Sequence, residues 1–239
     1  MLKPFFSFYG SKWRLAKCYP EPMFERIVEP FAGSAGYALN YFQRKVVLIE
    51  KDPVIAELWK YLINVQPDQV LQIPLLSDGQ GVDDVVFNDP AEKTLVGFWI
   101  AKAKAVPAKS QSSWMRKEKG DRLLNNFWGT KIRERVAQQV SHIKHWEVIS
   151  GDFEQASEIS DSTFFIDPPY AVKGKHYRHR MTESDFERLA QMSLCLSGQV
   201  IVCENRGADW LPFVDFVTSR SQLKGQRSKE VIFHRTGGV

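Results

Sequence analysis

The stretch Phe164-Phe165-Ile166-Asp167-Pro168-Pro169-Tyr170 joins an apolar, strand-forming run to an acid and two prolines. Three other short apolar runs also end at an acid. They are Ile27-Val28 before Glu29, Val46-Val47-Leu48-Ile49 before Glu50, and Val200-Ile201-Val202-Cys203 before Glu204. Continuous apolar runs are typical of parallel strands buried on both faces of a sheet. The sequence therefore predicts parallel strands that end at acidic residues.

Helical patterns separate these runs, at about 35–43, 53–64 and 183–197. The third helix follows Thr182, a residue type suited to an N-cap. Its expected buried face consists of Phe186, Leu189, Ala190, Ser193 and Leu194. Alternating strands and helices predict an α/β fold with an open, Rossmann-like and mostly parallel sheet. Two further strands, at 213–218 and 231–234, are expected to close it as an antiparallel C-terminal hairpin.

Residues 66–145 interrupt this alternation and are predicted to form an inserted, helix-rich subdomain, with helices at about 91–105 and 130–143. Positive charge is concentrated there, because residues 101–150 contain 11 Lys and Arg against 4 Asp and Glu. A solvated charged face would explain this, but local positive charge also suits a phosphate backbone. We therefore expect 66–145 to be a nucleic-acid-binding subdomain, and 1–65 with 146–239 to form the catalytic domain.

Composition excludes several classes of protein. Of the 239 residues, 44% are hydrophobic and 25% charged, which is typical of a globular protein, and no apolar run is long enough to cross a membrane. The three cysteines form no Cys-x-x-Cys pair, so neither a disulfide framework nor a zinc site is expected. His176 and His179 lack a third ligand nearby, so no metal is expected. A cytoplasmic monomer is favoured, although nothing in the sequence fixes the oligomeric state.

A glycine-containing turn follows the first strand, in Glu29-Pro30-Phe31-Ala32-Gly33-Ser34-Ala35-Gly36. Glycine lets a backbone approach a bound nucleotide closely, although tight strand–helix turns also use it for steric reasons alone. Glu50 ends the next strand about twenty residues on, where an acid can accept hydrogen bonds from ribose hydroxyls. Asp52 competes for this role but suits a helix N-terminus better. The full G-x-G-x-x-G pyrophosphate pattern is absent, which favours an adenosine without phosphates.

The Asp167–Tyr170 turn indicates chemistry on an exocyclic amine. The lone pair of such an amine is delocalised into its ring, so two acceptors must hold its hydrogens and direct the lone pair towards an electrophile. Asp167 and the carbonyl of Pro168 are expected to supply them, and the two prolines make the turn rigid. Tyr170 would stack on a base that has left its helix.

Together these motifs resemble the Dam-like family of adenine-N6 DNA methyltransferases, over most of the chain. Pro4-Phe-Phe-Ser-Phe-Tyr-Gly-Ser-Lys12 is similar to that family's N-terminal element, with Ser11 in place of its second glycine. Gly151-Asp152-Phe153 resembles the element beside the adenine of S-adenosylmethionine. The resemblance implies a class I methyltransferase sheet and S-adenosylmethionine as the cofactor. The residues it implies for cofactor binding are Phe8, Tyr9, Lys12, Phe31, Gly33, Gly36, Glu50, Asp152, Phe153 and Asp167, and those for catalysis are Asp167, Pro168, Pro169 and Tyr170.

The insertion carries a weaker part of the resemblance. Trp114-Met-Arg-Lys-Glu-Lys-Gly-Asp-Arg122 is similar to the family's DNA-reading hairpin, with Gly120 at the turn. Asn126-Phe-Trp-Gly129 then departs from the family's N-P-F-G, which leaves GATC or another target open. A basic loop at 171–182 is either a DNA contact or a solvated loop. The residues expected to bind DNA are Arg116, Lys117, Lys119, Arg122, Asn126, Lys173 and Arg178.

We therefore expect a site-specific enzyme that methylates N6 of a flipped adenine in double-stranded DNA. Methylation of cytosine N4 in DNA or of an amine in RNA is an alternative, and so is an inactive nucleic-acid-binding module. The compartment is expected to be the cytoplasm of a bacterial or phage-infected cell. Restriction–modification, replication marking and phage defence evasion all remain open as biological roles.

Overall fold

The computed structural model describes residues 1–102, 104–117, 120, 126–171, 180–220 and 227–237. The chain divides into two compact units, which are treated separately below. The first unit contains Met1–Ala16, Gly33–Gln43 and Pro53–Val148, and the second contains Lys17–Ala32, Arg44–Asp52 and Ile149–Val239. The predicted division into a catalytic domain and an inserted subdomain at 66–145 remains a prediction about function.

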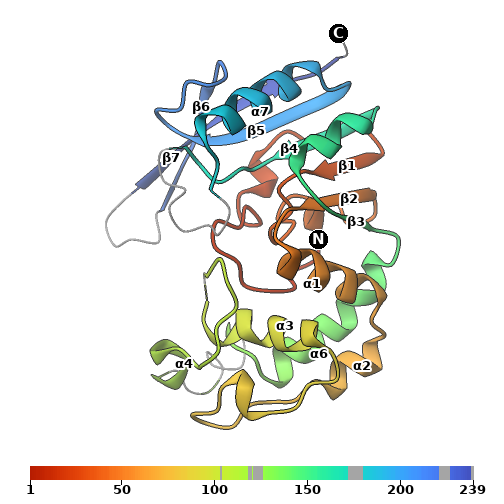
Figure 1. Cartoon of the computed structure of the whole chain (residues 1–239), viewed down its shortest axis with the longest axis vertical. Helices are drawn as coiled ribbons and strands as arrows, with labels where there is room; N and C mark the ends of the chain where they lie inside the picture. The colour runs from red at the N-terminus through yellow and green to blue at the C-terminus, as the bar shows by residue number, and fades with distance from the viewer. Residues whose placement is uncertain (103, 118–119, 121–125, 172–179, 221–226, 238–239) are drawn as a thin grey trace. The chain divides into compact units, whose positions relative to one another are not determined.

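A seven-stranded sheet, counted over the described residues, dominates the second unit (Figure 1), in the order β3-β2-β1-β4-β5-β7-β6. Its strands are β1 (Arg26–Glu29), β2 (Lys45–Glu50), β3 (Glu147–Ser150), β4 (Ser162–Ile166), β5 (Gly198–Asn205), β6 (Val214–Arg220) and β7 (Arg227–Arg235). β1 pairs in parallel with β2 and β4, and β4 pairs in parallel with β5. β7 runs antiparallel to both β5 and β6. The predicted α/β fold is confirmed, with a Rossmann-like sheet that is mostly parallel and has an antiparallel C-terminal hairpin.

The strands in the middle of the sheet are buried on both faces. Every residue of β4 and β5 is buried, as their continuous apolar sequences predicted. Ile166, the last residue of β4, pairs in register with Val202 of β5. The residues that follow these two positions therefore emerge at the same edge of the sheet, beyond the carboxyl ends of the strands.

Helix α7 (Glu183–Cys195) covers part of this sheet and lies over β5 in Figure 1. Thr182 caps it as predicted, since its Oγ1 accepts the backbone N–H of Asp185 at 3.2 Å. Phe186, Leu189 and Ser193 of the predicted face are buried and Ala190 is half-buried. Leu194 was wrongly assigned to this face: it is 48% exposed. Met192 is buried instead, within the cluster that also contains Val200 and Val202.

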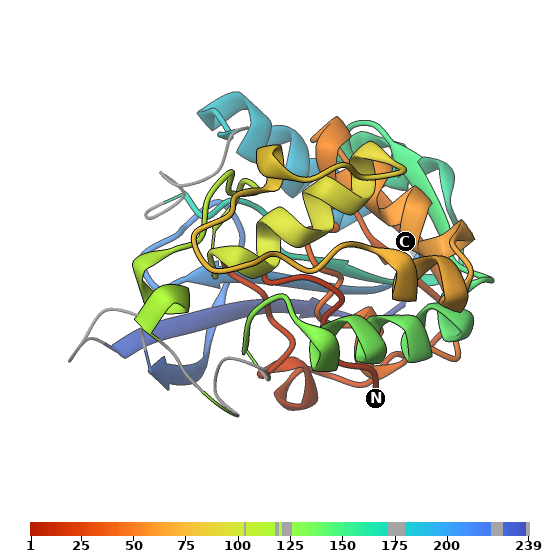
Figure 2. The same ribbon diagram turned by 90° about the horizontal axis from the view of Figure 1, so that it is seen from below.

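The first unit is built mainly of helices. They are α1 (Pro53–Asn64), α2 (Pro67–Gln72), α3 (Pro90–Ile100), α4 (Ser113–Lys117) and α6 (Thr130–Val140). Figures 1 and 2 show α6 beside α2, with which it is in contact. Fully buried aromatic rings fill the interior of this unit, and Phe6 packs edge-on against Trp59 and at a tilt against Phe98, with centroids 5.5 and 5.2 Å away.

Two predicted helices are shorter than expected, each for a local reason. The segment 35–43 forms only a 3-10 turn at Ala38–Asn40. Ala35 has a φ of 50°, which no right-handed helix accommodates, and Tyr41 leaves the helical region with a φ of −120° and a ψ of 33°. Helix α3 ends at Ile100 rather than near 105. The chain folds back there so closely that a Cβ on Gly97 would meet the Cβ of Pro107 at 2.8 Å.

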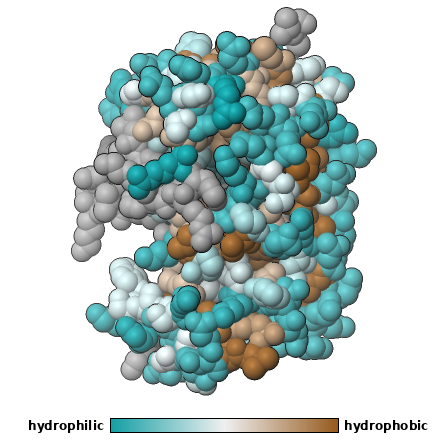
Figure 3. Space-filling model, viewed as in Figure 1, coloured by the Kyte–Doolittle hydropathy of each residue, from teal (hydrophilic) through white to brown (hydrophobic). Residues whose placement is uncertain are grey.

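Hydrophilic residues predominate on the face seen in Figure 3, with apolar residues in small separate patches. No described helix has both the length and the hydropathy needed to cross a bilayer. Within the same residues, no three His, Cys, Asp or Glu side chains gather as metal ligands would. His176 and His179 lie outside the described residues.

Candidate active site

The Asp167–Tyr170 turn begins directly after β4, at the edge where the parallel strands end. Pro168 is buried, whereas Asp167, Pro169 and Tyr170 are each half-buried. A carboxylate on a short rigid turn, next to a strand that is buried on both faces, is held in place by the sheet rather than by a loop. The predicted catalytic residues thus lie together, on a well-supported element.

The hydroxyl of Tyr170 points into the protein, where its oxygen is buried. Burial, followed by the nearby charge of Asp167 and that of Glu230, raises the pKa of this hydroxyl well above its ordinary value. Tyr170 is therefore neutral at physiological pH. The residue as a whole is half-buried, and its stacking on a base stays a prediction.

Glu204 lies beside this turn and was noted in the sequence only as an acid that ends a strand. Its side chain is fully buried. Oε1 accepts the backbone N–H of Ala171 at 2.7 Å, and Oε2 accepts that of Asn205 at 2.5 Å. Burial raises the pKa of this carboxyl, although the two backbone N–H groups oppose the effect. The acid thereby ties β5 to the residue that follows Tyr170.

A second buried acid in this unit, Glu230, could not be recognised from the sequence. Oε2 of Glu230, on β7, accepts a hydrogen bond of 2.7 Å from the hydroxyl of Tyr19. Burial raises the pKa of Tyr19 well above its ordinary value, so this tyrosine stays a neutral donor. The Tyr19 ring packs edge-on against Phe165 of β4 at 5.1 Å, two residues before Asp167.

Glu50 ends β2, as predicted, and is half-buried. Its Oε1 accepts the backbone N–H of Asp52 at 2.9 Å, while its carbonyl accepts the N–H of Gly151 at 3.0 Å. Asp52 directly precedes α1, in keeping with the helix-terminal role considered for it. The structure thus brings the strand-ending acid next to the Gly151-Asp152-Phe153 element.

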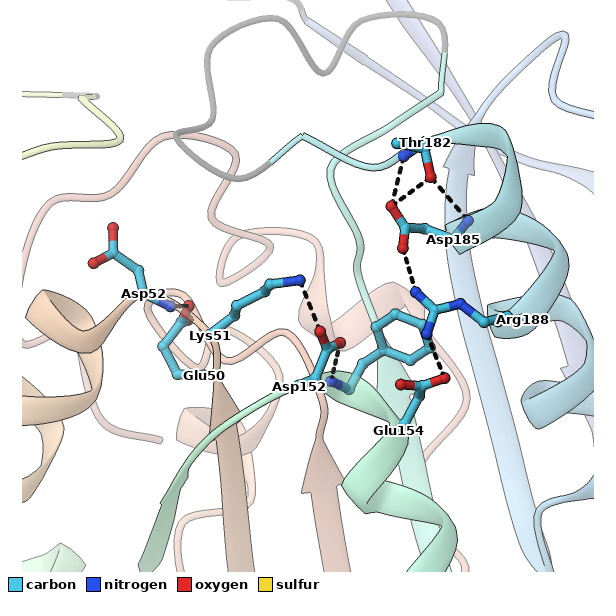
Figure 4. A network of polar contacts seen from close by, with 9 residues as sticks. Glu50, Lys51, Asp52, Asp152, Glu154, Thr182, Asp185 and Arg188 are labelled. Atoms are coloured by element: carbon cyan, nitrogen blue, oxygen red, sulfur yellow. Dashed lines mark hydrogen bonds and ion pairs between the residues drawn. The ribbon is translucent and has the colours of Figure 1, made fainter.

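Figure 4 shows the polar contacts of Asp152, which lie within this unit. Oδ2 of Asp152 accepts from Lys51 Nζ at 2.7 Å, and Oδ1 accepts the N–H of Phe153 at 2.7 Å. The Phe153 ring stacks on Phe31, with centroids 5.4 Å apart, and the guanidinium of Arg188 lies 5.8 Å from its centroid. Phe153 is buried and Phe31 half-buried, so Phe31 is the more accessible of the two rings.

The remaining predicted donor-binding residues belong to the first unit and lie close together there. The ring of Phe8 packs against Phe98 at 5.8 Å, and a Cβ on Gly33 would come within 3.1 Å of it. A Cβ on Gly36 would meet the backbone nitrogens of Trp13 and Lys12 at 2.7 and 3.0 Å. Glycine is therefore required at position 36 for steric reasons.

The N-terminal element also makes polar contacts in the first unit. The Ser34 hydroxyl donates to that of Ser11 at 2.8 Å, so the serine in place of the family's second glycine is hydrogen-bonded to the glycine turn. Lys12 is buried, and its Nζ donates to the carbonyl of Gly10 at 3.4 Å. Tyr9 donates its backbone N–H to the carbonyl of Lys104 at 3.1 Å. The element is thus joined both to the glycine turn and to the segment after α3.

The residues predicted to bind DNA are only partly described. Arg116 and Lys117 are exposed on α4, and Asn126 accepts a hydrogen bond from Lys102 Nζ at 2.8 Å. Because 113–117 is helical, the prediction that Trp114 to Lys117 form one arm of a hairpin is wrong for these residues. Trp114 is 73% exposed on the same short helix. Lys119, Arg122, Lys173 and Arg178 lie outside the described residues.

No family model matches the chain, and no curated protein matches it in sequence. Solved structures give distant likenesses. An rRNA methyltransferase, aviRa of Streptomyces viridochromogenes, is 14% identical with a TM-score of 0.43, over 98% of this chain and 88% of its own. The yhhF protein of Escherichia coli, a proposed methyltransferase, is 11% identical with a TM-score of 0.37. The match covers 89% of the present chain and 76% of the yhhF chain.

A conserved hypothetical protein of Streptococcus pyogenes is 14% identical with a TM-score of 0.34, over 87% of this chain and 84% of that one. At this level of identity and TM-score, none of these likenesses tells what the present chain binds or acts on.

Proposed function

We propose that this chain is an S-adenosylmethionine-dependent methyltransferase that acts on the N6 amine of a flipped adenine in double-stranded DNA. The observation that carries the proposal is the position of Asp167. It stands on a two-proline turn, at the end of a fully buried parallel strand, and it is half-buried beside Tyr170. That is the arrangement which the chemistry of an exocyclic amine requires.

In the proposed reaction, the side chain of Asp167 and the carbonyl of Pro168 each accept a hydrogen bond from one N–H of the amine. The nitrogen lone pair then attacks the methyl carbon of the donor in line. The N–C bond forms as the C–S bond breaks, its electron pair stays on sulfur as a neutral thioether, and the nitrogen releases one proton to solvent. Positioning and electrostatic complementarity supply the rate enhancement, and no covalent intermediate with the protein is formed.

The chain's residues suit an adenosine-containing donor. In the second unit, we propose that Glu50 accepts hydrogen bonds from the ribose hydroxyls and that Asp152 accepts one from the adenine amine. The ring of Phe31 would lie beside the adenine base. Phe153 supports Phe31 by stacking on it. In the first unit, Phe8, Tyr9, Lys12, Gly33 and Gly36 are proposed to contribute donor contacts, as the resemblance implies.

DNA is the proposed substrate because cationic side chains are exposed in the insertion. Arg116 and Lys117 lie on α4 beside the exposed ring of Trp114. Cations bind phosphates, and exposed aromatic rings stack on unpaired bases. A turn that holds one exocyclic amine also suits others, so cytosine N4 and RNA amines are the outcomes against which the proposal is tested.

The experiment incubates the protein with labelled donor and either double-stranded DNA or RNA, and then analyses the nucleosides by mass spectrometry. N6-methyladenine from DNA alone supports the proposal. N4-methylcytosine, or methylated nucleosides from RNA alone, would replace the substrate. Calorimetric titration with S-adenosylmethionine tests the donor, and the absence of binding would favour an inactive nucleic-acid-binding module.

A further inference from the structure

Glu204 lies where it can act on the catalytic turn. Ile166 and Val202 are paired across β4 and β5. Two residues beyond them come Pro168, in the turn after β4, and Glu204, near the end of β5, so both lie at the same edge of the sheet. Glu204 is also paired with Val231 of β7, and β5 is fully buried at this point. The backbone of Glu204 is therefore held by β7, just beyond the last residue pair that β5 makes with β4.

The carboxylate of Glu204 uses both oxygens to accept backbone hydrogen bonds. Oε2 accepts the backbone N–H of Asn205, the next residue in the same strand, at 2.5 Å. Oε1 accepts the backbone N–H of Ala171, the residue immediately after Asp167-Pro168-Pro169-Tyr170, at 2.7 Å. Hydrogen bonds from backbone N–H groups to a buried carboxylate are among the stronger ones in proteins. The turn is thus fixed at its first residue by β4 and just beyond its last by Glu204.

We propose that Glu204 is a positioning residue for methyl transfer, which acts by holding the C-terminal end of the catalytic turn. This inference rests on the proposed function. Asp167 and the Pro168 carbonyl must both meet the amine, and a displacement of about 1 Å can cost roughly a hundredfold in rate. A side chain that restrains Ala171 limits such displacement without touching the substrate itself.

The test compares Glu204→Ala and Glu204→Gln with Glu92→Ala as the matched control. Glu92 is also a buried glutamate that accepts a backbone N–H, from Asn88 at 3.0 Å, but it belongs to α3 in the other unit. Glu204→Gln keeps an oxygen for Ala171 and loses the acceptor for Asn205. A purely structural role would make the two alanine variants alike in both stability and activity.

We expect Glu204→Ala to lower kcat by roughly a hundredfold, with the Kd for S-adenosylmethionine and the KM for DNA each changed by less than about threefold. Glu204→Gln should recover a large part of kcat, and Glu92→Ala should leave kcat near that of the wild type. If Glu204→Ala does not fold, Glu204→Gln decides, with a measurable loss of kcat expected. A folded variant with wild-type kcat, or equal losses in Glu204→Ala and Glu92→Ala, would overturn the inference.

Amide hydrogen exchange separates this inference from the proposed function. The Ala171 N–H should exchange slowly in the wild-type protein and faster in Glu204→Ala, whether or not any methylation is detected. Unchanged exchange at Ala171 would overturn the positioning role. A wild-type protein that binds no donor and methylates nothing would instead overturn the proposed function.

Discussion

The hydroxyl of Tyr19 donates a 2.7 Å hydrogen bond to Glu230, although the two residues lie 211 positions apart in the chain. Both are buried, and the Tyr19 ring also stacks on Phe216 of β6 at 4.7 Å. This pair joins the start of the second unit to its last two strands. It also lies near enough to the Asp167–Tyr170 turn for both members to raise the pKa of Tyr170.

Tyr19→Phe removes the donor to a buried carboxylate and should lower the free energy of unfolding. The expected cost is on the order of 1–3 kcal/mol, because a buried acceptor that loses its donor still bears its desolvation penalty. Urea denaturation measures it. A double-mutant cycle with Glu230→Gln should give a clear coupling energy, and strictly additive effects of the two substitutions would contradict the account.

Asp185 should make the stability of the protein depend on pH. Hydrogen bonds from Thr182, its backbone N–H foremost, together with Arg188, hold the pKa of Asp185 below its ordinary value. Its contribution is therefore present above the unfolded-state value of about 3.9 and is lost as the pH falls through the lower folded-state pKa.

Asp185→Asn should accordingly be less stable than the wild type at pH 7, by roughly 0.5 kcal/mol, because its ion-pair partner Arg188 is exposed to solvent. The two proteins should converge as the pH falls below about 4. Thermal melts across this pH range make the comparison. A stability difference that persists or grows under acid would show that the carboxylate is not the cause.

The side chain of Lys51 is expected to reduce the affinity of the wild-type protein for S-adenosylmethionine, because it forms an ion pair with Asp152 at 2.7 Å. Lys51→Met frees Asp152 for the adenine amine and also removes a cation from the site of a cationic donor. We expect the Kd for S-adenosylmethionine to fall by roughly two- to fivefold, since exposed pairs are worth up to about 1 kcal/mol. Calorimetry with Asp152→Asn should give weaker binding. Weaker binding in Lys51→Met would contradict the proposed role of Asp152.

Arg116→Ala and Lys117→Ala should each weaken DNA binding and reduce its dependence on salt. Each lost phosphate contact lowers the slope of log Kobs against log salt by about one. Fluorescence anisotropy over a salt series gives both quantities. Lys60→Ala is a matched control, since Lys60 is an exposed lysine of α1 paired with Glu57. Equal losses in the control variant would point to general charge rather than to α4.

The sequence allowed the sheet to be predicted because burial on both faces imposes a readable pattern on parallel strands. Phe164 to Ile166 and Val200 to Cys203 are continuous apolar runs for that reason, and an acid follows each run directly. Helix ends were less predictable. The helix expected at 35–43 does not begin at Ala35, because Ala35 has a positive φ. The spacing of hydrophobic residues does not reveal such a backbone conformation.

The position of the Asp167–Tyr170 turn, directly after a buried strand, could be predicted because one motif holds its residues. The polar contacts that support it could not, because they depend on register and long-range packing. Glu204 was visible as a strand-ending acid, but its bond to Ala171 requires the pairing of β4 with β5. Tyr19 and Glu230 meet only once the last hairpin has joined the sheet.

The most direct test of the central claim is the amount of N6-methyladenine formed in DNA by wild-type protein and by Asp167→Ala. We predict N6-methyladenine with the wild type and a loss of at least about a hundredfold in the variant, while donor binding measured by calorimetry is partly retained. Full activity of Asp167→Ala would contradict the assignment of this turn as the catalytic site.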